Sequence, residues 1–348
     1  MNDRINTNNF DFLRVIFALT VAFAHLIELS EVEMFKPYKK FFNARLAIDG
    51  FFVISGFLIA KSYESSKNTK EYILKRIKRI VPAYVFVILF CALLFCFIST
   101  ESISSYFSND QFWKYLIANL TFQNYVEPCL PGVFQNNLLC AVNGALWTIK
   151  IEEAFYLLVP LFYLITKSKK PKIHFLGVLI YLFSIIYFNY FLSIDMYRIA
   201  KQLPGALAFF VTGILSYKNF DFIMKWKHHL IFPILVLFLL EQYVFYTQIF
   251  KPMVYGIMVF YIAYNFKILN NFGKYGDFTY GVYIYHFPLI QLFVHFDLFN
   301  RYNPVLIAVG LIILLIISAV FSWYFLELTY LSESRKKRQQ MMLKRTKY

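Results

Sequence analysis

Apolar side chains are concentrated in ten stretches along the chain, and short polar segments divide them. The stretches cover residues 10–29, 44–60, 80–98, 143–166, 173–193, 203–217, 229–247, 250–266, 277–296 and 304–326. Most of them approach the ~20 apolar residues that a helix needs to cross a bilayer. The short stretches 203–217 and 250–266 are separated from their neighbours by four basic residues, namely Arg198, Lys201, Lys218 and Lys251. The pattern predicts an all-α polytopic integral membrane protein with about ten transmembrane helices.

The composition supports this prediction and excludes several protein classes. Apolar and aromatic residues make up 59% of the 348 residues, against ~45–50% in soluble domains. Charged residues make up 16%, where ~25% is usual. A soluble enzyme, a disordered protein and a disulfide-stapled secreted domain are therefore excluded.

The positive charge of the chain is a topology signal. Lys and Arg number 35 against 20 Asp and Glu, a net charge of +15. With the N-terminus in the cytoplasm, 24 of the Lys and Arg residues fall in cytoplasmic segments and 8 in outer loops. This bias predicts that both termini are cytoplasmic. The basic runs at Lys75–Arg79 and Arg335–Arg338 are expected to face lipid headgroups, so we expect a bilayer and no nucleic acid as partner.

The chain is expected to form one membrane domain over residues 1–330, followed by a basic cytoplasmic tail over residues 331–348. The first apolar stretch contains Arg14 and His25. It lacks the small-residue cleavage site of a signal peptide, so it is expected to remain as a span.

One long outer connection, residues 99–142, joins the third and fourth spans. Within it, residues 112–122 (FWKYLIANLTF) are amphipathic and are predicted to form an interfacial helix. Cys129 and Cys140 both lie in this connection. In an oxidising compartment they are candidates for a disulfide, although the sequence alone does not show that their Cα atoms are close enough.

Ionisable residues inside spans are costly and are candidates for function. Arg14 and His25 are eleven residues apart, which at ~100° per residue places them on one stripe of a helix, separated by a rise of ~16 Å. Asp49 lies in the antiparallel second span, at a similar depth to His25. A carboxylate beside a histidine fixes its tautomer and raises its basicity. The alternatives are a snorkelling Arg14, a structural His25 and an interfacial Asp49 that caps its helix.

Further candidates lie in three other segments. Glu152 and Glu153 are adjacent acids in the fourth span, for which a cavity-lining role, structural or catalytic, is expected. Arg76 and Arg79 lie where the third span begins, and guanidinium groups bind phosphates bidentately; the alternative is a topology anchor. His286 lies mid-span, before Pro288. No histidine pair has metal-ligand spacing, so no metal is predicted.

Together these residues resemble the signature of acyltransferase family 3, over nearly all of the chain. The matching segments are FDFLRVIFALTVAFAH (10–25), IDGFFVISGFLIA (48–60), LKRIKRIVPAY (74–84), LWTIKIEEAFYLLVP (146–160) and GVYIYHFP (281–288). Thr148 stands where Ser is usual, Lys150 and Ala154 replace small polar residues and Gln, and Gly50 follows the acid where Leu is common. Thr148 keeps the hydroxyl, and Lys150 and Ala154 bear on acceptor contacts near Glu153. None of these departures touches the pair Arg14 and His25.

The resemblance implies a bacterial inner-membrane O-acetyltransferase that moves an acetyl or other acyl group from cytoplasmic acyl-CoA to a glycan or lipid-linked sugar, such as the O-antigen of lipopolysaccharide. An extra hydrolase-like domain, found in some members, is expected to be absent. Acyl-CoA phosphates would lie near Arg14, Arg76 and Arg79. The implied substrate-binding residues are Trp147, Glu152 and His286.

We expect His25 to act as general base on the acceptor hydroxyl, with Asp49 orienting it and Glu153 supporting the site. An acyl-histidine intermediate is the alternative mechanism. Two other functions remain open: a flippase for a lipid-linked sugar, which predicts no acyl-CoA dependence, and a non-catalytic assembly or sensor protein. The sequence leaves the acceptor sugar, the acyl group and the oligomeric state open.

Overall fold

The computed structural model describes residues 5, 7–245, 247–266, 269–270 and 272–331. These residues form helices joined by turns, and no β-strand occurs among them. The chain divides into two compact units. The first unit contains Met1–Leu13, Leu46–Leu74 and Ile151–Phe272, and the second contains Arg14–Arg45, Lys75–Lys150 and Gly273–Tyr348. Except for Leu331, the predicted basic tail lies outside the described residues.

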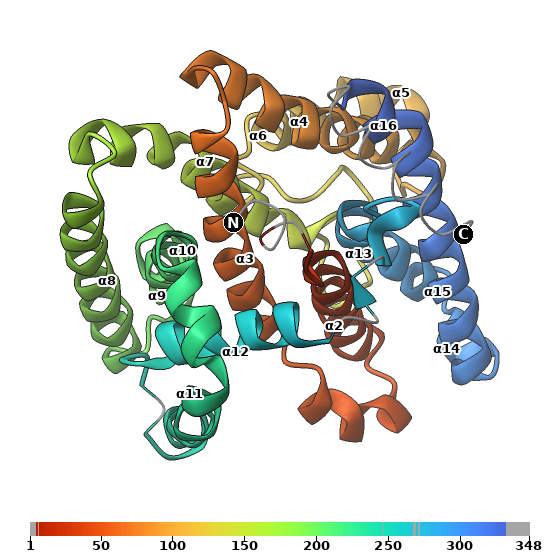
Figure 1. The fold of residues 1–348 in the computed structure, drawn as a ribbon. Coiled ribbons are helices and arrows are strands. Elements are labelled where there is room, and N and C mark those ends of the chain that lie inside the picture. The colour runs from red at the N-terminus through yellow and green to blue at the C-terminus, as the bar shows by residue number, and fades with distance from the viewer. Residues whose placement is uncertain (1–4, 6, 246, 267–268, 271, 332–348) are drawn as a thin grey trace, which may run out of the picture. The chain divides into compact units, whose positions relative to one another are not determined.

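Each of the ten predicted apolar stretches corresponds to a helix (Figure 1). In chain order these are α2 (Phe10–Ser30), α3 (Ala44–Glu64), α4 (Thr69–Leu94), α7 (Trp147–Thr166), α8 (Lys170–Ser193), α10 (Leu203–Lys218), α11 (Phe220–Leu240), α12 (Lys251–Asn265), α13 (Thr279–His295) and α15 (Pro304–Phe321). The prediction of an all-α polytopic membrane protein is confirmed.

Seven helical stretches in the described part of the chain are long and apolar enough to cross a membrane. The other three predicted spans, α7, α12 and α13, differ for identifiable reasons. α7 carries Lys150, Glu152 and Glu153 near its start. α12 has 15 residues and α13 has 17, below the ~20 of a full span. Most side chains of α13 are buried, so this helix is surrounded by protein and can carry polar groups.

Shorter helical elements fill the connections. They are Glu33–Phe41, Phe95–Phe97, α5 (Ile103–Ser108), α6 (Asp110–Leu120), Gly144–Leu146, α9 (Tyr197–Ala200), Glu241–Phe245, Phe272–Lys274, α14 (Leu298–Arg301), Ser322–Glu327 and α16 (Leu328–Tyr330). The helix predicted at 112–122 is present as α6 and begins two residues earlier. It does so because the Asn109 side chain accepts a hydrogen bond from the Gln111 amide and caps the helix.

In the first unit, two glycines allow α3 and α10 to touch through their backbones. A Cβ on Gly56 would lie 1.9 Å from the Phe210 carbonyl oxygen, and one on Gly213 would lie 2.1 Å from that of Val53. Small residues at such crossings are how membrane helices approach closely. The second glycine of the segment 48–60 is therefore a packing requirement.

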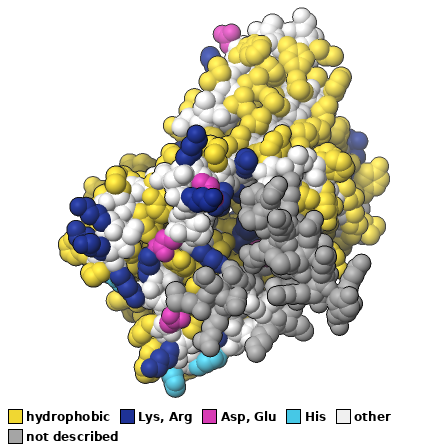
Figure 2. Space-filling view, turned by 45° about the horizontal axis from the view of Figure 1, so that its top comes forward, with side chains coloured by type: hydrophobic (Ala, Val, Ile, Leu, Met, Phe, Trp, Pro, Cys, Tyr) yellow, Lys and Arg dark blue, Asp and Glu magenta, His cyan; other side chains and the backbone are white. Residues whose placement is uncertain are grey.

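The surface of the protein is rich in apolar side chains, as expected where helices face lipid. Figure 2 shows apolar side chains over much of the face it presents. The outward side chains of α8 include Phe175, Leu182 and Ile186, and those of α15 include Leu306 and Ile317. These helices bury few of their residues within the protein, which is typical of spans at the lipid boundary.

Candidate active site

His25 and His286 form a direct contact in the second unit. Nδ1 of His25 on α2 lies 2.8 Å from Nε2 of His286 on α13. The two rings are nearly parallel, with an interplanar angle of 7° and centroids 5.1 Å apart. His286 is fully buried, whereas His25 is half-buried. The sequence singled out both residues but did not predict that they meet.

His286 is held by its own helix and by the start of α7. Its Nδ1 lies 3.2 Å from the Val282 carbonyl oxygen, one turn earlier on α13. The neighbouring Tyr283 ring stands edge-on to His286, and its hydroxyl lies 2.5 Å from Oγ1 of Thr148. The hydroxyl of Thr148, the group that Thr and Ser share, makes this contact.

The segment just before α7 also contacts α13, close to His286. The Asn143 amide donates to the Ile284 carbonyl oxygen at 2.8 Å. A Cβ on Gly144 would come within 2.6 Å of the Phe287 ring, and that ring stands edge-on to His25. Sequence reasoning missed Asn143 and Gly144, because they precede the motif at 146–160.

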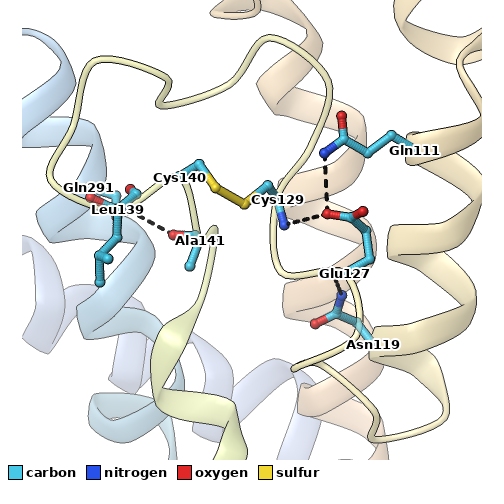
Figure 3. The surroundings of a disulfide bond; sticks show 8 residues. All are labelled: Gln111, Asn119, Glu127, Cys129, Leu139, Cys140, Ala141 and Gln291. Atoms are coloured by element: carbon cyan, nitrogen blue, oxygen red, sulfur yellow. Dashed lines mark hydrogen bonds between the residues drawn. A yellow bond between two sulfur atoms is a disulfide. The ribbon is translucent and has the colours of Figure 1, made fainter.

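The outer connection, residues 99–142, is hydrogen-bonded to α13 at a position beyond His286. Cys129 and Cys140 form a disulfide with Cα atoms 5.4 Å apart. The buried Gln291 donates from Nε2 to the carbonyl oxygens of Leu139 and Ala141, both at 2.7 Å, and Figure 3 shows this amide beside the disulfide. Gln291 lies five residues beyond His286, so the same helix carries the histidine and anchors the connection. An isolated Gln in an apolar stretch was the available signal, and the sequence reasoning did not use it.

Two of the three predicted phosphate-binding arginines, Arg14 and Arg79, are engaged in a buried ionic network. Arg14 Nη1 and Arg79 Nη2 each lie 2.7 Å from Oδ2 of Asp277, and Arg79 Nη1 lies 2.5 Å from Oε2 of Glu327. The Ser322 hydroxyl donates to the other oxygen of Glu327. Each of these two arginines therefore lies beside a carboxylate of opposite charge. Sequence reasoning missed Asp277, the first residue of the ninth predicted span, and Glu327, which directly follows the tenth.

Aromatic rings complete the surroundings of Arg79. Its guanidinium carbon lies 5.6 Å from the ring centroid of Tyr280 and 5.9 Å from that of Trp323. Stacking and bidentate pairing are what a guanidinium offers and an ammonium does not. Arg76 lies one turn earlier on α4 and is half-buried.

The remaining predicted site residues lie mainly in the first unit. Asp49 is buried in α3. Glu152 accepts hydrogen bonds from the hydroxyls of Ser55 at 3.1 Å and Tyr156 at 2.5 Å, and the adjacent Glu153 is half-buried. In the second unit, Trp147 is the first residue of α7. The pairing of Asp49 with His25 and the roles of the two glutamates stay predictions.

Comparison with known proteins identifies the family of this chain. A family model described as an acyltransferase domain, Acyl_transf_3, matches residues 7–325. The chain belongs to acyltransferase family 3. The match contains every residue of the histidine contact, and all of the ionic network except Glu327.

Relatives of this acyltransferase include proteins named for acetyl transfer. It is similar to the O-acetyl transferase of Shigella phage Sf6, at 27% identity over 344 residues that cover 95% of this chain and 98% of the relative. It is also similar to the putative peptidoglycan O-acetyltransferase YrhL of Bacillus subtilis, at 24% identity over 329 residues. That alignment covers 81% of this chain and 50% of the relative, so the chain spans about half of that protein. No solved structure matches the chain.

The candidate site is made of nitrogen bases and ion pairs. Within the described residues, no group of three or more His, Cys, Asp or Glu side chains is arranged to hold a metal ion. The described histidine pair and the arginine network lie at opposite ends of the signature segment 10–25. The arrangement offers a proton acceptor at one end and guanidinium groups at the other.

Proposed function

We propose that this acyltransferase is an inner-membrane O-acetyltransferase, which moves an acetyl group from cytoplasmic acetyl-CoA to a hydroxyl of a cell-surface glycan such as lipopolysaccharide O-antigen. The observation that carries the proposal is the contact between His25 and His286 at 2.8 Å, inside a family acyltransferase domain. The contact supports a role for His25 as a base within an apolar helix, and transfer to a hydroxyl requires such a base. The names of the relatives support acetyl as the group and a surface glycan as the acceptor.

The charge distribution supports the direction of transfer. The predicted cytoplasmic segments are strongly basic, so the charged nucleotide of acyl-CoA would stay on that side. Arg76 is the proposed phosphate contact, with Arg14 and Arg79 beside it in their network with Asp277. The pantetheine arm would then extend along the ~16 Å between Arg14 and His25, and the acceptor would approach from the outer side.

The proposed chemistry is a direct acyl transfer. His25 removes the proton from the acceptor hydroxyl while its oxygen attacks the thioester carbonyl carbon. The C–S bond then breaks, and the CoA thiolate takes the proton back from His25. The roles predicted from the sequence for Glu152, Glu153 and Trp147, in binding the acceptor or supporting the site, are retained as proposals. In the alternative mechanism, His25 itself carries the acetyl group before the hydroxyl attacks.

The decisive experiment combines one variant with two readouts. Membranes that contain the protein or its His25→Ala variant are incubated with labelled acetyl-CoA, and the label on glycan is measured; NMR of the host glycan then counts O-acetyl groups. We expect label with the wild-type protein and none with the variant at equal membrane levels. Normal acetylation by the variant would refute the role of His25. If the wild-type protein transferred no label to glycan, the result would instead support the flippase alternative.

A further inference from the structure

The hydrogen bonds of His286 determine which of its nitrogens carries a hydrogen. A carbonyl oxygen can only accept, so the contact of Nδ1 with the Val282 carbonyl oxygen at 3.2 Å places the hydrogen on Nδ1. His286 has no exposed surface, and an additional charge is costly in such a place. The ring is therefore assigned as neutral, with a lone pair on Nε2.

The assignment of His286 then determines the tautomer of His25. Nδ1 of His25 lies 2.8 Å from the lone-pair nitrogen of His286, Nε2, so it must carry the hydrogen and donate it. In a neutral imidazole one nitrogen is a donor and the other is an acceptor. The basic nitrogen of His25 is then Nε2.

We propose that His286 is a positioning residue that fixes His25 in the tautomer with a basic Nε2. In many acyl-transfer enzymes a carboxylate on Nδ1 performs this task. Here the acceptor on Nδ1 is the lone pair of a second, neutral histidine, so the role expected of Asp49 from the sequence is assigned to His286. The inference rests on the proposed function of His25 as the reacting base.

The surroundings of His286 make it suited to this task. Thr148 and Tyr283 join the start of α7 to the turn that carries His286, and Asn143 holds the carbonyl oxygen of Ile284. An acceptor that is itself held by packing and hydrogen bonds keeps its partner in one orientation.

The proposed tautomer serves either mechanism with balanced chemistry. In direct transfer, Nε2 takes the hydroxyl proton, the oxygen–carbon bond forms, the C–S bond breaks, and the thiolate recovers the proton. In the covalent mechanism, the Nε2 lone pair forms a bond to the acetyl carbon while the C–S bond breaks and the CoA thiolate leaves. The acceptor hydroxyl then attacks the acetyl carbon, the bond to Nε2 breaks, and the hydroxyl proton passes to the thiolate. While His25 is cationic, its bond to His286 becomes charge-assisted, which strengthens it.

The test compares three substitutions in the full-length protein. His286→Leu removes the acceptor, His286→Gln can offer an oxygen near the position of Nε2, and His295→Leu on the same helix is the matched control. With labelled acetyl-CoA we expect kcat to fall by ~100-fold or more for His286→Leu, with KM for acetyl-CoA within about twofold of wild type. We expect His286→Gln to recover kcat to within about tenfold, and His295→Leu to match wild type.

A second measurement does not depend on any variant of His286 folding. In the nitrogen NMR spectrum of protein labelled at histidine, His25 should show a protonated Nδ1 and a bare Nε2, with the signal assigned by its loss in His25→Ala. The reverse tautomer would overturn the proposal, as would equal loss of kcat in folded His286→Leu and His286→Gln. Loss of activity in His25→Ala together with full activity in His286→Leu would refute this inference and leave the proposed function standing.

Discussion

Arg14 and Arg79 share one oxygen of Asp277: a nitrogen of each guanidinium lies 2.7 Å from Oδ2. Asp277 and Arg79 are almost completely buried, and Arg14 is partly exposed. Two arginines that would repel each other are thereby joined through one carboxylate. The network is thus a structural unit as well as a candidate donor site.

We expect Asp277→Asn to destabilise the protein by about 3–5 kcal/mol, because removing one partner leaves buried charge uncompensated. Thermal unfolding in detergent, compared with wild type, measures the change. The matched control is Asp297→Asn, whose pair with Arg301 is exposed and 3.7 Å long. An exposed pair contributes about 0–1 kcal/mol, so the control should unfold near the wild-type temperature. Equal stability of both variants would contradict the structural role of Asp277.

Replacing Arg76 by Gln and replacing Arg79 by Gln should have different effects on stability and on KM for acetyl-CoA. Arg79 is buried and has two nitrogens committed to Asp277 and Glu327, so Arg79→Gln should lower thermal stability strongly. Arg76 is only half-buried, so Arg76→Gln should lower stability much less. It should raise KM for acetyl-CoA by about tenfold, because one charge-assisted phosphate contact contributes about 1.5–3 kcal/mol. Steady-state kinetics and unfolding are measured on the same preparations, and an unchanged KM in Arg76→Gln would remove Arg76 from the donor site.

Gly56→Ala should destabilise the first unit, since its Cβ would lie 1.9 Å from the Phe210 carbonyl oxygen. Forced overpacking costs about 1–3 kcal/mol or more, and backbone cannot yield as a side chain can. Gly310→Ala on α15 is the control, because nothing lies within 4 Å of the position that its new methyl group would occupy. The readout is the yield of monodisperse protein after extraction, with the unfolding temperature. Equal behaviour of the two variants would contradict the close crossing of α3 and α10.

The disulfide should contribute about 2–4 kcal/mol by restricting the unfolded chain. Cys129→Ser, Cys140→Ser and the double variant should all lose the same amount, because each removes the same bond. Unfolding with and without reductant measures the effect, and alkylation before reduction reports the bonding state of Cys129 and Cys140. A wild-type protein that is alkylated at both residues without reductant would show that the bond does not form in the membrane.

Local periodicity accounts for much of what the sequence predicted correctly. Apolar stretches located all ten helices, and the spacing of Arg14 and His25 placed both on one stripe of α2. The partners were not predictable in this way. His286, Asp277 and Glu327 reach these residues from segments far away in the sequence, and nothing in a local pattern specifies which distant side chains meet.

One physical reason explains why the sequence did not predict the roles of several residues. Gln291 and Asn143 act on backbone carbonyl groups, so their partners have no side-chain signature in the sequence. The glycine of 48–60 that faces α10 shows the same limit, because its partner is the carbonyl oxygen of Phe210. Such contacts depend on where a helix lies, which is determined only when the helices have packed.

Two cross-links join α2 to the segment that contains α13: Arg14 with Asp277, and His25 with His286. Eleven residues separate the links on α2 and nine on the other segment, and both segments run in the same direction between them. A slip of α13 by one turn, ~5.4 Å, would break both links at once. The two segments therefore share a fixed register. A change in the ionic network that shifts one segment along the other should also displace the ring of His25 relative to that of His286.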